Sequence, residues 1–155
     1  QLTGLKEALK NEALVQTAAE NEANELMHAV ELSRRGVNAG ENKAIPLVGS
    51  GMFAESLYKR ALVAEDEATG ERKVGFDDVD EIGGFTKQAT SFRIKLSRDT
   101  RMGDPRNLGD FDKDTKSEFE FTDPERAGLF EGKRVSLDWG KVRELAAEAE
   151  KRFNA

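Results

Sequence analysis

Residues 3–35 read TGLKEALKNEALVQTAAENEANELMHAVELSRR and carry helical spacing without a proline. Apolar side chains recur every three or four positions, so one face of the predicted helix is apolar along most of its length. This stripe consists of Leu5, Leu9, Ala13, Val15, Ala19, Ala23, Leu26 and Val30. Arg34, Arg35 and Gly36 are typical of a helix end, because cations suit the negative end of the dipole and glycine accepts a left-handed conformation. The sequence therefore predicts one long helix over residues 3–35.

Such a helix is long for a chain of 155 residues. At about 1.5 Å per residue it extends roughly 45 Å, which exceeds the ~30 Å diameter of a small domain. A domain of this size covers only part of the stripe. We therefore expect one end of it, either Leu5 and Leu9 or Leu26 and Val30, to contact another subunit.

The composition predicts a single domain, residues 1–155, with a thin core. Hydrophobic residues make up 37% of the chain and charged residues 35%, and this balance favours much exposed surface and stabilisation by oligomerisation. The formal net charge is −6 and no basic run occurs. Binding to a phosphate backbone then lacks its usual electrostatic driving force, so nucleic acid is not expected as the main ligand.

Several classes of site are excluded by residue type. The chain contains no cysteine, which excludes disulfides, thiolate metal sites and cysteine nucleophiles. No apolar stretch approaches the ~20 residues of a membrane helix, and no signal peptide is apparent, so we expect a soluble protein without a membrane partner. The chain begins at Gln1 without an initiator methionine, which is typical of a processed or truncated chain.

The middle of the chain, residues 57–122, is predicted to be rich in β-structure. Residues 57–64 and 71–76 form the arms of a hairpin around the acidic turn 66–70. Residues 89–97 alternate apolar and polar side chains, which predicts a strand whose core-facing residues are Phe92, Ile94 and Leu96. Residues 118–121 repeat this alternation more briefly, and a long loop over residues 97–117 separates the two strands.

The C-terminal part begins with a short helix and ends with a longer one. Pro124 suits the first position of a short helix that ends near Gly132. Asp138 is a good N-cap for the final helix, over residues 138–153, with Leu137 and Val142 spaced for a hydrophobic staple. The apolar face of that helix consists of Val142, Leu145, Ala146, Ala149 and Phe153. We therefore predict an α+β fold in which two helices pack on a small antiparallel sheet of three to five strands.

The acidic loops resemble metal sites only in part. Asp110, Asp112 and Asp114 have the spacing that begins an EF-hand calcium loop. However, Thr115 and Phe121 occupy the positions where that loop needs glycine and glutamate. A second acidic group, residues 77–81, lacks a histidine partner, and adjacent acids in such a loop are usually solvated. We expect no metal site and no cofactor.

The loop over residues 97–117 is more suited to protein contacts. Arg98, Arg101 and Arg106 alternate with acids around Gly103 and Pro105, and the stretch contributes little to a core. A guanidinium can form bidentate bonds with a carboxylate across an interface, and long loops often carry such contacts. These three arginines are our candidate interface residues, against the alternative of a simple solvated loop. His28, the one histidine, is expected at the surface.

One combination of motifs resembles a known family. The chain opens with Gly4-Leu5-Lys6-Glu7-Ala8-Leu9, and later Pro46 precedes Ser50-Gly51-Met52-Phe53-Ala54-Glu55-Ser56-Leu57. This is similar to the tail-completion and head–tail connector proteins of long-tailed bacteriophages, whose members often combine a Gly-Leu-Lys-Glu-Leu-like start, a long helix, and a Thr-Gly-x-Leu-x-x-Ser-like turn into a small sheet. Ser50 stands in place of the threonine, Phe53 in place of the leucine, and Gly51 and Ser56 match. The resemblance covers about the first half of the chain.

The resemblance implies a non-enzymatic ring subunit of a virion, in contact with copies of itself and with other structural proteins. Without it, the same reading of the residues gives a cytoplasmic assembly protein. The alternative function is a cation-dependent binding module or a small enzyme that uses the acidic loops.

The first prediction concerns the loop that contains Asp110, Asp112 and Asp114. Because the turn glycine and the terminal glutamate are missing, we expect no stoichiometric calcium binding in the micromolar range by calorimetric titration. Micromolar binding that Asp112→Ala abolishes would contradict this.

Overall fold

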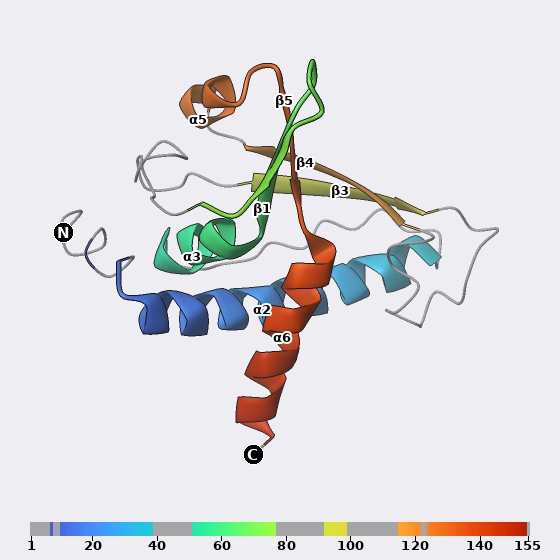
Figure 1. The fold of residues 1–155 in the computed structure, drawn as a ribbon. Helices are drawn as coiled ribbons and strands as arrows, with labels where there is room; N and C mark the ends of the chain where they lie inside the picture. The colour runs from blue at the N-terminus through green and yellow to red at the C-terminus, as the bar shows by residue number, and fades with distance from the viewer. Residues whose placement is uncertain are drawn as a thin grey trace.

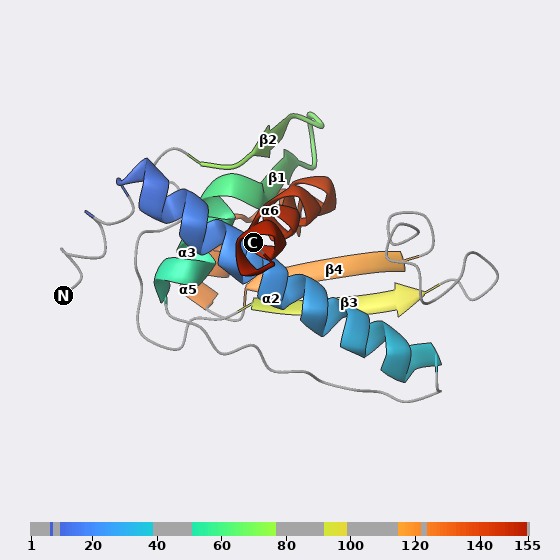
Figure 2. The same cartoon turned by 90° about the horizontal axis from the view of Figure 1, so that it is seen from below.

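The computed structural model describes residues 7, 10–38, 51–76, 92–98, 115–121 and 124–154. The elements in these ranges are α2 (Glu12–Asn38), α3 (Gly51–Ala61), β1 (Leu62–Asp66), β2 (Arg72–Val74), β3 (Phe92–Arg98), β4 (Thr115–Phe121), α5 (Pro124–Leu129), β5 (Lys133–Leu137) and α6 (Trp139–Phe153). Helices α2, α3 and α6 lie on one side of the strands, and α6 crosses α2 (Figure 1). Viewed from below, α2 and α6 lie in front of the strands (Figure 2). The predicted α+β class is confirmed.

Helix α2 begins nine residues later than the sequence pattern predicts, so the expectation of one unbroken helix from Thr3 is wrong. Asn11 is not helical, and its Oδ1 accepts hydrogen bonds from the backbone N–H groups of Ala13 at 3.1 Å and Leu14 at 3.2 Å. An asparagine that satisfies the free N–H groups of a first turn favours a helix start over a continuous helix. At the other end, α2 continues through Gly36 to Asn38.

The predicted hairpin is confirmed, but its first strand starts later than expected. Residues 57–61 belong to α3, because Leu57, Tyr58 and Ala61 are buried at helical spacing. Strand β1 follows directly at Leu62 and pairs antiparallel with β2. In the turn, Asp66 Oδ1 accepts from the N–H groups of residues 68 and 69 at 2.8 and 3.0 Å. These hydrogen bonds, that from Thr69 first, lower the pKa of Asp66.

The strands in the described ranges form two antiparallel sheets. One sheet has the order β2-β1-β5, with Leu62 opposite Leu137, and β1 is its central strand. The other consists of β3 and β4, with Phe92 opposite Phe121. Of the three residues predicted to face the core from β3, Ile94 is partly buried and packs against it. The side chains of the other two, Phe92 and Leu96, lie outside the described part of the structure.

Aromatic rings join the two sheets to α3. Tyr58 of α3 meets Phe121 of β4 edge to face, with ring centroids 5.4 Å apart, and also meets Phe119 at 6.4 Å. Phe121 in turn stacks on Phe130 at 5.5 Å, and Phe130 meets Phe76 at 6.4 Å. Such edge-to-face and offset contacts stabilise a core beyond the area that they bury. The β3–β4 pair is therefore anchored to the rest of the fold through the Phe121 end of β4.

The start of helix α6 agrees with its sequence signals. Asp138 is the N-cap, and its Oδ1 accepts from the N–H of Lys141 at 3.1 Å. Leu137 and Val142, the predicted staple pair, are both buried. The predicted apolar face is correct except at its end, because Phe153 lies in the last turn, beyond the covered part of the helix, and is 70% exposed.

The core forms where α2 meets α3, α6 and the strands. The buried face of α2 consists of Val15, Ala18, Ala19, Ala23, Leu26, Met27 and Val30. Helix α6 contributes Val142, Leu145, Ala146 and Ala149. Helix α6 crosses α2 (Figure 1), and both helices contribute buried alanines to the core.

Gly75 supplies a prediction about the junction between β2 and the core. Its φ is +76°, and a Cβ there would lie 2.6 Å from the carbonyl oxygen of Lys59. We expect Gly75→Ala to lower the free energy of unfolding by about 1–3 kcal/mol from backbone strain, with a further loss from this clash, measured by denaturant titration. Gly70→Ala is the matched control, because Gly70 has a φ of +74° and nothing within 4 Å of the added methyl. An equal loss in both variants would contradict the role assigned to the clash.

Candidate functional site

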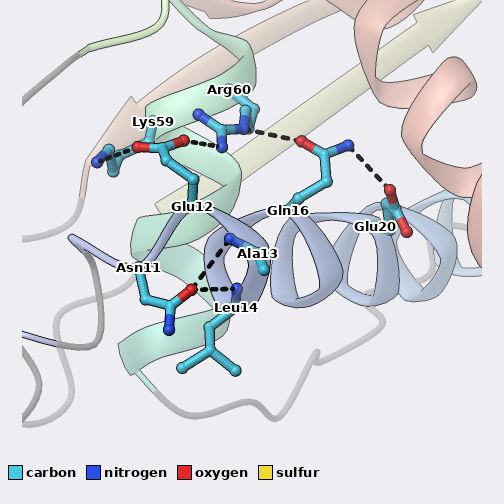
Figure 3. Close-up of polar contacts among 8 residues, drawn as sticks. All are labelled: Asn11, Glu12, Ala13, Leu14, Gln16, Glu20, Lys59 and Arg60. Atoms are coloured by element: carbon cyan, nitrogen blue, oxygen red, sulfur yellow. Dashed lines mark hydrogen bonds and ion pairs between the residues drawn. The ribbon is translucent and has the colours of Figure 1, made fainter.

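The clearest cluster of charged side chains in the described structure lies along one side of α2. Glu12, Gln16 and Glu20 are spaced four residues apart, so they follow one another along the helix surface. They contact Lys59 and Arg60 at the end of α3 and Arg152 at the end of α6. We call these six residues the polar row; Figure 3 shows all of it except Arg152.

The first part of the polar row joins α2 to α3. Arg60 donates one hydrogen bond from Nε to Gln16 Oε1 at 3.0 Å, and its Nη2 forms an ion pair with Glu12 (Figure 3). Lys59 Nζ lies 3.8 Å from the other oxygen of Glu12, and the Lys59 side chain is only 4% exposed. The hydrogen bond and then the charge of Arg60, with a smaller effect of Lys59, lower the pKa of Glu12. Glu12 is therefore held in its ionised form.

The second part of the polar row joins α2 to α6. Gln16 Nε2 donates to Glu20 Oε2 at 2.9 Å (Figure 3), and Arg152 Nη1 donates to Glu20 Oε1. The second amino group of Arg152 donates to Asn21 Oδ1 at 2.8 Å. Both oxygens of the buried Glu20 carboxylate thus have donors, which offsets the cost of burying its charge.

The chemistry of the polar row is that of a clamp between helices. The carboxylates of Glu12 and Glu20 face cationic side chains of α3 and α6, so the polar row binds the three helices to one another. Among the residues that the structure describes, no group of three or more histidine or acidic side chains is placed to hold a metal ion.

Glu22 is a buried carboxyl group outside the polar row. It is 5% exposed, and its Oε2 has no hydrogen-bond partner among the described residues. Burial, and to a smaller extent the nearby charge of Glu25, raises its pKa from 4.5 to about 7. Glu22 lies between Ala19 and Leu26 in the apolar stripe, and this position is the signal in the sequence that could have indicated a buried acid.

The structure decides the position of some predicted interface residues and leaves others undescribed. Leu26 and Val30 are 3% and 4% exposed and belong to the chain's own core. Their assignment to a contact with another subunit is therefore corrected, because both side chains are already buried within this chain's own core. Arg98 is the last residue of β3, where its backbone pairs with Thr115. The candidates outside the described residues are Leu5, Leu9, Arg101, Arg106, Asp110, Asp112 and Asp114.

His28 lies at the surface, as expected. Its side chain is exposed on α2, and Nε2 lies 3.8 Å from Glu150 Oε1 of α6. This contact adds to the links between α2 and α6.

Comparison of the chain with protein-family models, with curated proteins and with solved structures found no match. A search of the helices in the described ranges also found none that is long and apolar enough to cross a membrane.

Glu22 gives a prediction with a defined pH window. Between pH 4.5 and about 7 the folded protein retains a proton that the unfolded chain has lost, so stability should decrease as the pH rises through this window. Glu22→Gln removes this titration. Its effect on the free energy of unfolding should therefore be more favourable at pH 8 than at pH 4.5, by up to about 3 kcal/mol. Denaturant titrations at the two pH values measure the difference.

Glu144→Gln is the matched control, because Glu144 is an exposed acid on α6. It should change the two free energies by similar small amounts. An equal effect of Glu22→Gln at both pH values would contradict the raised pKa.

Proposed function

We propose that this protein is a non-enzymatic structural subunit of a larger assembly, of the kind found at the head–tail junction of long-tailed phages. The observation that carries the proposal is the polar row, because its charged side chains on α2, α3 and α6 bind one another and hold the helices together. Side chains used in this way favour a rigid scaffold over a reaction site.

The order of the elements supports the same proposal. Gly51, which matches the glycine of the family turn, is the first residue of α3, and α3 leads directly into the β1–β2 hairpin. A long helix, a turn with this glycine and a small sheet are what the resemblance implies. On this proposal the protein acts in a virion, as a homo-oligomer, in contact with other structural proteins.

We propose that the residues before α2, together with its first turn, form the subunit contact. Leu14, in the first turn of α2, is 50% exposed, so a large apolar side chain is open to solvent. In the sequence it closely follows Leu5 and Leu9. Arg98, Arg101 and Arg106 remain the proposed polar contacts. Leu26 and Val30 are no longer part of this interface.

Sedimentation velocity with and without divalent cations tests the proposal against its alternative. An assembly subunit should form oligomers whose mass depends on protein concentration and is the same in calcium, in magnesium and in chelator. A monomer that compacts or associates only when a divalent cation is added would instead support a cation-dependent module that uses the acidic loops.

The division of the stripe gives a prediction with opposite outcomes for two leucines. Leu26→Glu should unfold the protein, because it places a charge in the core. Leu9→Glu should leave the circular dichroism spectrum unchanged and reduce the mass in solution, because Leu9 is proposed to contact another subunit.

Thr17→Glu is the matched control for added charge, because Thr17 is an exposed residue of α2. It should neither unfold the protein nor reduce its mass. A Leu9→Glu variant that unfolds, or that assembles like the parent protein, would show that the start of the stripe is not an interface.

A further inference from the structure

The ends of α3 and α6 both contact α2 through an arginine. Arg60 stands at position 10 of the 11 residues of α3, and Arg152 at position 14 of the 15 residues of α6. Each guanidinium group reaches side chains on the same row of α2. The two guanidinium groups carry like charges and do not attract each other. A favourable link between the two arginines must therefore pass through groups that accept their hydrogen bonds.

Gln16 and Glu20 provide such a link. Among the contacts of the described residues, the connection from Arg60 to Arg152 runs from Nε of Arg60 to Gln16 Oε1, from Gln16 Nε2 to Glu20 Oε2, and from Glu20 Oε1 to Arg152. Every step has one donor and one acceptor. The chain of hydrogen bonds is therefore complete from α3 to α6.

An amide is the side chain that this position requires. Arginine can only donate and an ionised glutamate can only accept, so the residue between them must accept on one side and donate on the other. Glutamine does both, whereas a glutamate at position 16 would repel Glu20 and a lysine would repel Arg60. The amide orientation is fixed by its two partners.

We propose that Gln16 couples the docking of α6 on α2 to the docking of α3. When Arg60 holds the oxygen of the Gln16 amide, the amide nitrogen is oriented toward Glu20, which keeps that carboxylate in place for Arg152. Loss of either arginine frees the amide and weakens the contact at the other end. This coupling is a property of the folded chain and does not depend on the proposed assembly role.

Native-state hydrogen exchange tests the coupling at a distance from the substitution. Arg60→Met should raise the exchange rates of amides in the last turn of α6 by at least about threefold relative to amides of β1, which report global unfolding. Arg152→Met should raise the rates in the last turn of α3 by a similar factor, because coupling is reciprocal.

The decisive comparison is made in a protein that carries Gln16→Met, because methionine is similar in size to glutamine and lacks both of its polar groups. In that background Arg60→Met should no longer change the rates in α6. If Arg60→Met prevents folding, Arg60→Lys replaces it, since lysine keeps the charge and lacks the Nε–H that binds Gln16.

Arg72→Met is the matched control, because Arg72 is an exposed arginine of β2 that lies 3.9 Å from Asp138, at the opposite end of α6. It should leave the last turn of α6 unchanged. Unchanged rates in α6 after Arg60→Met, or the same increase with methionine at position 16, would overturn the proposal.

Discussion

The fold depends on the burial of one face of α2. This helix has 27 residues. Helices in proteins gain most of their stability from the packing of an apolar face. Helices α3 and α6 both pack against α2, and α2 and α6 each contribute alanines to the core. The sheets then pack over the helices through Tyr58 and the phenylalanines of β4. Without α2, helices α3 and α6 would each lose the largest surface against which they pack.

Local signals in the sequence predicted the parts of the fold that local chemistry controls. The Asp138 cap, the turn at Asp66 and the alternation around Ile94 all depend on residues within a few positions of one another. The two errors in the helices have the same origin. Asn11 was treated as one residue of a continuous helical pattern, although its side chain caps the start of α2. The pattern of residues 57–64 fits a helix as well as a strand until its partners are known.

The polar row could not have been predicted from the sequence. Arg60 and Gln16 are 44 positions apart, and Arg152 and Glu20 are 132 apart. Each pair forms only because helices from different parts of the chain cross at that point. Glu20 and Glu22 illustrate the same limit, because both are buried acids on α2, yet Glu20 meets an arginine and Glu22 meets none in the described structure. The spacing of Glu20 and Glu22 along α2 places both side chains near the core. Only the three-dimensional arrangement shows which of the two carboxyl groups has a cationic partner.

The pairing of β1 with β5 has a consequence for how the protein is made. Residues 62–66 find their strand partners at residues 133–137, and α2 finds α6 still later in the chain. A ribosome releases α2 and α3 well before α6 exists, so the part of the α2 face that α6 covers stays exposed until residues 139–153 are synthesised. Contacts between such distant segments also slow folding. The nascent chain should therefore engage chaperones that bind apolar helices, and release should follow the emergence of α6.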